Sequence, residues 1–305
     1  GLGDVYKRQI YANMGEMDNK GVDANLEYQT RIGNKVGLLL FGNLTYSKNK
    51  IVFRDEPAMQ YAYQKSEGTR YGEFYGYIAE GYFQSEEEIK KSPRQMRELA
   101  PGDIKYKDLN DDGVIDANDQ CYLGKSWFPS WSYGMGFNIN YHNFDLALFF
   151  QGVSDVSIMA NGGSIDTGNG DWGASGVGIV PFTGMGLNPS NVITKALDRW
   201  TADNPRADAW YPRMTANATT NDNNYVNSTH WLKDGSYLRL KQASLGYTLE
   251  NKKLMDKGIE YLYFYLSGQN LLTFSKFKLW DPELGSNGAK YPLSRMVTLG
   301  MRVSF

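Results

Sequence analysis

Alternation of apolar and polar residues is the feature that most limits the folds open to this chain. In the segment GVDANLEYQTRI, residues 21–32, one set of alternate positions is mostly apolar and the other is wholly polar. Side chains of a strand alternate between its two faces, so this pattern predicts a β-strand with two different surroundings. In segment 237–249 the apolar phase shifts near Lys241 and Gln242, which predicts a β-bulge. The alternation predicts seven strands, at 21–32, 36–53, 133–141, 144–151, 237–249, 261–273 and 295–305.

The connections between these strands are of two kinds. The short ones are the turns Gly33-Asn34 and His142-Asn143 and the link 250–260. The long ones are 54–132, 152–236 and, less extended, 275–294. Counting strands back from Phe305 places all the long connections at one end of an up-and-down sheet. Short turns at one end and long loops at the other are typical of outer-membrane β-barrels, whose long loops are extracellular.

Composition favours a membrane barrel over several other classes. The chain has 32 basic and 34 acidic residues, which gives no reason to expect nucleic acid as a partner. One cysteine, Cys121, excludes an internal disulfide framework, and His142 and His230 have no zinc-site spacing. There is no run of 18 apolar residues and no signal peptide, and the opening GLGDVYKRQ raises the hypothesis that residues 1–15 include a non-native start. Aromatic residues at 14%, with 22 Tyr, match the aromatic girdles of a barrel.

The predicted strand count indicates that the barrel is incomplete. Bacterial single-chain barrels have even strand numbers of eight or more, and seven strands do not readily close. We therefore expect the chain to be the C-terminal part of something larger. Polar positions of the strands are expected to line the lumen, and they include Asp23, Asn25, Glu27, Gln29, Asn138, Asn140, Asp145 and Arg302.

Eight stretches, read in order, carry a family resemblance. They are NKGVDANLEY, GEFYGYIAEGYFQSEEEI, PGDIKYKDLNDDGVIDANDQCYLG, NFDLALFFQG, LDRWTADNP, DGSYLRLKQASLGYTL, GQNLLTFSKFKLWDPE and YPLSRMVTLGMRVSF. Together they resemble the SusC-like, RagA-like TonB-linked outer-membrane transporters of the Bacteroidetes, over nearly all of residues 16–305.

The resemblance implies an all-β fold, a transmembrane antiparallel β-barrel of 22 strands with a plug inside it. This chain would supply about the last seven strands, with extracellular loops at 54–132 and 152–236. The resemblance also implies a SusD-like surface lipoprotein as partner, contact with the TonB complex through the missing N-terminal part, outer-membrane lipid around the barrel, and import of oligosaccharides or peptides.

The stretch DLNDDGVIDAND, residues 108–119, matches a calcium-binding loop. That pattern places ligands at positions 1, 3, 5, 7, 9 and 12 with glycine at position 6, here Gly113. The predicted ligands of a structural Ca²⁺ are Asp108, Asn110, Asp112, the carbonyl of Val114, Asp116 and Asp119. Position 12 is Asp where Glu is usual, and this shorter side chain reaches the ion less easily. The alternative is a solvated acidic turn in which Gly113 makes the bend.

Other features leave room for competing interpretations. A secreted, β-rich, calcium-binding module for carbohydrate binding or adhesion would also show alternation, but with its apolar face buried. No enzyme is expected, since no carboxylate pair or activated nucleophile stands out. Two short helices are expected, one capped by Ser85 and one in PSNVITKALDRW with Val192, Leu197 and Trp200 as packing residues. Tryptophans of the long loops either pack those loops, which we favour, or stack on sugars; they are Trp127, Trp131, Trp172, Trp210 and Trp231.

Overall fold

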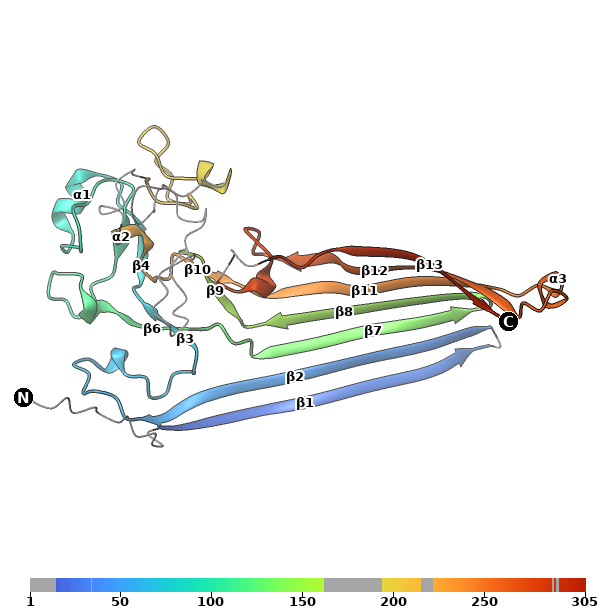
Figure 1. Cartoon of the computed structure of the whole chain (residues 1–305). Coiled ribbons are helices and arrows are strands. Elements are labelled where there is room, and N and C mark those ends of the chain that lie inside the picture. Colours follow the sequence, from blue (N-terminus) through green and yellow to red (C-terminus); the bar gives the residue numbers. More distant parts are fainter. Residues whose placement is uncertain (1–14, 34, 162–193, 215–221, 287, 289–290) are drawn as a thin grey trace, which may run out of the picture.

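A seven-stranded antiparallel sheet dominates the computed structural model, which describes residues 15–33, 35–161, 194–214, 222–286, 288 and 291–305. In spatial order its strands are β1 (Gly15–Ile32), β2 (Val36–Arg54), β7 (Trp131–Tyr141), β8 (Phe144–Ser154), β11 (Tyr237–Leu249), β12 (Tyr261–Ser275) and β13 (Met296–Ser304). Each strand pairs with the next one along the chain's own order. The long, narrow sheet has its short turns at one end and its long connections at the other (Figure 1).

All seven predicted strands are present, and so are the predicted turn and bulge. His142, in the turn between β7 and β8, has a positive φ of 51°. Gly33, in the turn between β1 and β2, has a φ of 60°. The register of β11 shifts between Leu240 and Gln242 against both of its neighbours, so the bulge lies at Lys241. The hypothesis about residues 1–15 falls almost wholly outside the described residues.

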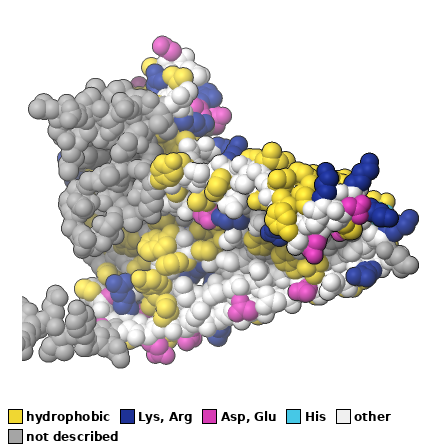
Figure 2. Space-filling view, turned by 45° about the vertical axis from the view of Figure 1, so that its right-hand side comes forward, with side chains coloured by type: hydrophobic (Ala, Val, Ile, Leu, Met, Phe, Trp, Pro, Cys, Tyr) yellow, Lys and Arg dark blue, Asp and Glu magenta, His cyan; other side chains and the backbone are white. Residues whose placement is uncertain are grey.

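The strand register places the apolar positions on one continuous face. Leu146 of β8 is opposite Leu245 of β11, which is opposite Leu266 of β12, which is opposite Leu299 of β13. Residues paired in this way point to the same side of the sheet. Leu266 is 48% exposed and Leu299 is 81% exposed, and hydrophobic patches are visible on the surface in Figure 2. No second sheet covers this face in the described part of the chain, contrary to what a soluble sandwich requires.

The buried core of the molecule lies in the long connections and not under the sheet. We call the described residues of 55–130 and 155–236 the loop body; they pack together at the end of the sheet away from the short turns (Figure 1). Its core includes Ile104, Tyr106, Tyr211 and Trp231, each at most 1% exposed. The described parts of these connections therefore form one close-packed unit.

Short hairpins and helices build the loop body. Within these connections the sequence predicted only short helices and the loop at 108–119. The elements are β3 (Glu73–Gly76) paired with β6 (Cys121–Ser126), β4 (Ala79–Tyr82) paired with β5 (Ile104–Tyr106), β9 (Ser157–Met159) paired with β10 (Leu232–Asp234), α1 (Glu86–Lys91) and α2 (Asp222–Tyr225). A further short helix, α3 (Lys252–Met255), lies in the link between β11 and β12. No helix in the described ranges is long and apolar enough to cross a membrane.

The two helix predictions have different outcomes. Ser85 caps α1 as predicted, since its Oγ accepts a hydrogen bond from the Glu88 amide at 3.2 Å. Of the second segment, Val192 lies outside the described residues, and the described residues begin with a 3₁₀ turn, Thr194–Leu197. Trp200 packs in the core as expected, but the packing role predicted for Leu197 is wrong, because its side chain is 76% exposed. Within this described turn the buried residue is Ala196, and Leu197 is directed away from the core.

Candidate functional site

The face of the sheet opposite the apolar one carries the residues predicted to line a lumen. Asn140 of β7 is opposite Asp145 of β8, and Asn138 is on the same face two residues away. Asn138, Asn140, Asp145 and Arg302 line a cavity of about 540 Å³ on this face. The other four predicted positions are in the edge strand β1, namely Asp23, Asn25, Glu27 and Gln29. They lie on the same face as Asn138, because Gln29 is opposite Leu39 and Leu39 is opposite Asn138.

Specific contacts order the polar side chains in this cavity. The Tyr263 hydroxyl donates a hydrogen bond to Asp145 Oδ2 at 3.0 Å. The guanidinium of Arg302 lies 6.0 Å from the centre of the Tyr263 ring, within the range of a cation–π contact. Asp145, Tyr263 and Arg302 come from three different strands, so this part of the face is an organised polar surface and not a set of independent side chains.

Aromatic rings on the same face lie over strand glycines. A Cβ added at Gly300 would collide with the ring of Tyr265, and one added at Gly136 would collide with the ring of Phe41. Glycine in a strand interior marks a site of close approach, and a ring laid over it recovers some of the lost packing. Phe41 also stacks on Phe149 at 6.0 Å. The face is therefore amphipathic locally, with polar groups and aromatic rings side by side.

The predicted calcium loop folds into a compact turn closed by its own side chains. Asp108 Oδ2 accepts from the Gly113 amide at 2.8 Å, and Asp112 Oδ1 accepts from the Val114 amide at 2.9 Å. Asp116 Oδ1 accepts from the Asn118 amide at 2.7 Å, which caps the 3₁₀ turn Ala117–Asp119. The structure therefore brings the predicted ligand residues into one short loop around Gly113, whose φ is 81°.

The six predicted ligand residues differ in how well they fit an ion. Asp108 Oδ1 is buried and has no hydrogen-bond partner, so it is free to bind a cation. Asp119 is fully buried, and its two oxygens accept the amides of Leu109 and Asp116 at 2.7 and 2.8 Å. Among the described residues, no group of three or more His, Cys, Asp or Glu side chains is arranged to hold a metal ion. In this conformation Asp119 holds the two ends of the loop together through its hydrogen bonds.

A buried polar network joins the two long connections inside the loop body. The Asp103 carboxylate, 2% exposed, is 2.6 Å from Arg213 Nε and accepts from the Asn224 amide at 2.7 Å. The Gln95 amide donates to Asn223 Oδ1 at 2.8 Å. Gln95 and Asp103 belong to the first long connection and the other three residues to the second. Sequence reasoning missed this network because its members are more than 100 residues apart and follow no period.

A largely buried histidine, His230, lies beside this core. His230 Nε2 is 3.3 Å from the Tyr82 hydroxyl and 3.2 Å from the Trp210 carbonyl oxygen. Burial, and then the positive charge of Lys233, lowers the pKa of His230 to about 4. At neutral pH this imidazole is a neutral hydrogen-bonding group in the loop body.

The tryptophans of the long connections divide between packing and exposure. Trp231 is fully buried and in contact with the rings of Tyr211 and Tyr225, which confirms the packing interpretation for it. Trp131 begins β7 and lies 4.4 Å from the ring of Tyr46. Trp127 is 49% exposed, and Trp172 is outside the described residues.

Comparisons with known proteins agree with this geometry. No protein-family model matches the chain. The chain is 26% identical over 321 residues to TonB-dependent receptor P3 of Formosa agariphila, an alignment that covers 96% of this chain and 29% of that protein. It is 29% identical over 323 residues to TonB-dependent receptor P26 of the same organism, covering 96% of this chain and 30% of that protein. The chain thus spans about three tenths of the length of these curated relatives, which are named as receptors and not as enzymes.

Solved structures show the same fold. The structure of the RagAB peptide importer in the open-open state matches with a TM-score of 0.65 at 21% identity, over 95% of this chain and 29% of that chain. The closed-closed state of the same importer matches with a TM-score of 0.65 at 22% identity, over 97% of this chain and 30% of that chain. These comparisons agree with the resemblance drawn from the sequence: over nearly its whole length, this chain is similar to about three tenths of the length of curated TonB-dependent receptors, and it shares the fold of the matching part of the RagAB importer.

Proposed function

We propose that this chain is part of the barrel wall of a TonB-dependent importer in a bacterial outer membrane. The observation that carries the proposal is the continuous apolar face of the sheet, exposed from Leu26 at 75% in β1 to Leu299 at 81% in β13. An exposed apolar surface spanning a whole sheet is unfavourable in water but matches the lipid-facing side of a barrel. The opposite face, with Asn140, Asp145 and Arg302, would line the lumen.

The open sheet edges support the same proposal. Within the described residues, β1 pairs only with β2 and β13 only with β12, so each edge has unpaired backbone groups. Backbone groups in the membrane interior need partners, which further strands of a closed barrel would provide. We therefore place the seven strands as the C-terminal part of a larger barrel, with the plug and the contact to TonB in segments outside this chain.

The partner and cargo follow from the position of the loop body. In this proposal the loop body is extracellular and forms the surface on which a SusD-like lipoprotein closes. The cargo is an oligosaccharide or a peptide. The similarity to the RagAB peptide importer supports an imported polymer but not a particular one.

We further propose that Ca²⁺ stiffens the loop at residues 108–119. The unpartnered Asp108 oxygen supports this, and oxygen-only ligands select calcium or magnesium. Asn110, Asp112, the carbonyl of Val114 and Asp116 would complete the set. Both Asp119 oxygens already accept a backbone hydrogen bond, and both Asp112 oxygens also accept a hydrogen bond, so these two carboxylates would bind the ion through their remaining lone pairs. The bound ion would neutralise the clustered carboxylates and fix the first long connection.

Membrane location and import can be tested together in cells that produce the intact receptor. We expect the protein in the outer-membrane fraction, with a gel mobility that changes on boiling, and a lipoprotein that co-purifies with it in detergent. Uptake of its substrate should stop when TonB is inactivated. Recovery of the intact protein in the soluble fraction without detergent would instead favour the secreted module.

A further inference from the structure

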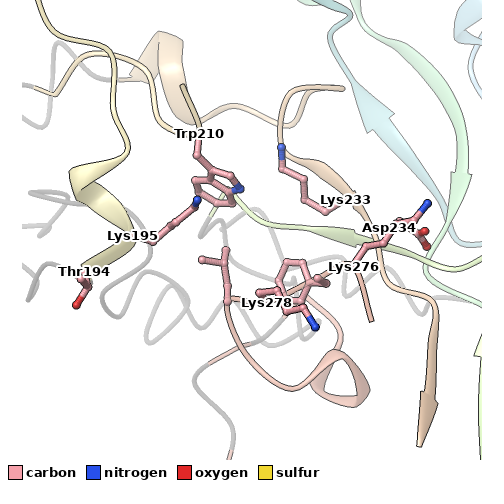
Figure 3. A pocket seen from close by; sticks show the side chains of 9 residues that line it. Thr194, Lys195, Trp210, Lys233, Asp234, Lys276 and Lys278 are labelled. Carbon is pink, nitrogen blue, oxygen red and sulfur yellow. The ribbon is translucent and has the colours of Figure 1, made fainter. Parts of the chain in front are cut away.

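A cavity of about 560 Å³ lies at the junction of the loop body and the sheet (Figure 3). Its walls come from four parts of the chain: the 3₁₀ turn at Lys195, the segment at Trp210, the strand β10 with Lys233 and Asp234, and the segment after β12 with Lys276 and Lys278. Four lysines against one aspartate make it a strongly cationic pocket. The indole of Trp210 forms part of the wall and lies among the lysines in Figure 3. We call it the lysine pocket.

Packing holds the walls of the lysine pocket in place. Phe277, between two of the lysines, is 6% exposed and packs with Ile158 and Ala160. Lys233 is in register with the same Ile158 across the β9–β10 pair. The segment after β12 and the strand β10 are thus fixed against one another, so the positive charges are brought together before any ligand arrives.

The charge of the lysine pocket is only partly balanced by the protein. Lys195 Nζ pairs with Asp198 Oδ2 at 2.7 Å. Lys233 Nζ donates to the His230 carbonyl oxygen at 2.7 Å and lies 5.2 Å from the centre of the Trp210 ring. Within the described part of the chain, no carboxylate lies within 4.0 Å of the ammonium groups of Lys233, Lys276 or Lys278. Among the described residues, these three cations have no counter-ion in direct contact.

The pKa of Lys233 shows that its positive charge is unfavourable in the lysine pocket. Burial, and then repulsion from Lys195, lowers the pKa of Lys233. Partly buried like charges are unfavourable unless an opposite charge offsets them. An anionic group in the pocket would do this, and it would also interact with Lys276 and Lys278, whose side chains are exposed.

We propose that the lysine pocket binds the carboxylate or sulfate group of an acidic oligosaccharide, an inference that rests on the importer function proposed above. The pocket is large enough for a sugar ring, and the Trp210 indole gives that ring an apolar surface next to the ammonium groups. An acidic peptide also carries carboxylates for the ammonium groups, but an oligoglutamate has no ring face to lie against the Trp210 indole. The pocket therefore favours acidic sugars over neutral sugars and over acidic peptides.

The test is binding to the intact receptor in detergent, measured by calorimetry. The probes are an oligogalacturonate, its neutral methyl ester, a sulfated oligosaccharide and an oligoglutamate peptide. We expect an acidic sugar to bind at least about tenfold more tightly than the methyl ester, with an affinity that falls as salt is added. The double variant Lys276→Gln/Lys278→Gln should lose about tenfold in affinity for the acidic sugar. Both side chains are exposed, so the fold should persist.

The matched control is Lys90→Gln/Lys91→Gln, which removes two exposed charges from α1, away from the lysine pocket. It should bind the acidic sugar as the unaltered receptor does. Equal affinity for the acid and its methyl ester, or no change in the Lys276/Lys278 double variant, overturns the inference. Tighter binding of oligoglutamate than of either acidic sugar overturns the assignment to carbohydrate. In these cases TonB-dependent uptake of a neutral or peptide substrate would leave the importer proposal intact.

Discussion

Removing the Asp103 carboxylate should weaken the packing of the two long connections against each other. Asp103 accepts hydrogen bonds from the Ala100 amide at 2.9 Å, the Asn224 side chain at 2.7 Å and Arg213 Nη2 at 2.9 Å. Asp103→Ala leaves these donors without an acceptor and Arg213 without its counter-ion. Breaking a buried ion pair by removing one partner costs about 3–5 kcal/mol. Arg213 retains 23% exposure, so water compensates in part and we expect the lower end, about 3 kcal/mol.

Hydrogen exchange of the intact receptor in detergent measures this effect locally. A loss of about 3 kcal/mol corresponds to roughly 100-fold faster exchange if the protected amides open by local unfolding. The acceleration should appear in β5 and α2, which Asp103 and Asn224 join, and not in the seven-stranded sheet. The control Asp208→Ala removes a carboxylate that is 83% exposed and should change nothing measurable. Unchanged protection of β5 and α2 in Asp103→Ala would refute the idea that this network joins the connections.

Three further predictions concern the lipid face, the calcium loop and the buried histidine. Leu266→Arg places a charge on the apolar face and should destabilise the barrel by about 2–4 kcal/mol at the bilayer midplane. The control Ser267→Arg places the same charge on the polar face and should leave the stability unchanged. The temperature at which each protein loses its folded gel mobility measures the difference in stability. Calcium should slow proteolysis of residues 54–132, and Asp112→Ala should abolish that effect. If the protein takes up no metal and the variant resists protease equally well, the calcium proposal is refuted. Because the pKa of His230 falls from 6.5 to about 4 on folding, the unfolded loop body takes up the proton first as pH decreases. The free energy of unfolding of the loop body should therefore be highest above about pH 6.5 and decrease by about 1–3 kcal/mol toward pH 4. Unfolding followed by tryptophan fluorescence measures this decrease, and His230→Gln should make it smaller.

The sheet was predictable from sequence because its signals are local. The alternation in residues 21–32 reports directly on the two faces of β1, and the phase change near Lys241 reports on the bulge. The positive φ of His142 likewise follows from a two-residue turn between strands. Each of these features is encoded within a few residues, and the pairing of each strand with the next requires no long-range information.

The loop body was not predictable for the opposite reason. Its core joins residues such as Tyr77 and Ser228, which form a parallel bridge across some 150 positions of the chain. The lysine pocket similarly gathers Lys195, Lys233 and Lys276 from separate segments. Nothing in the spacing of these residues marks them as neighbours, because tertiary packing alone brings them together.

The calcium loop is an intermediate case. Its ligand pattern, from Asp108 to Asp119, is local and predicts a calcium-binding loop, with an acidic turn around Gly113 as the alternative. The pattern did not reveal that both oxygens of Asp119 accept backbone hydrogen bonds inside the loop. Side chains that bind an ion and side chains that cap a turn are of the same types, so sequence cannot separate the two roles.

The central claim, that one face of the sheet contacts lipid and the other a watery lumen, can be tested with spin labels on the intact receptor in lipid. In a Cys121→Ser background, nitroxides placed singly at Leu266, Ser267, Thr298 and Leu299 sample both faces of β12 and β13. The account predicts high accessibility to oxygen and low accessibility to a water-soluble nickel reagent at Leu266 and Leu299, with the reverse at Ser267 and Thr298. Equal accessibility at all four positions, or nickel access at the two leucines, would contradict it.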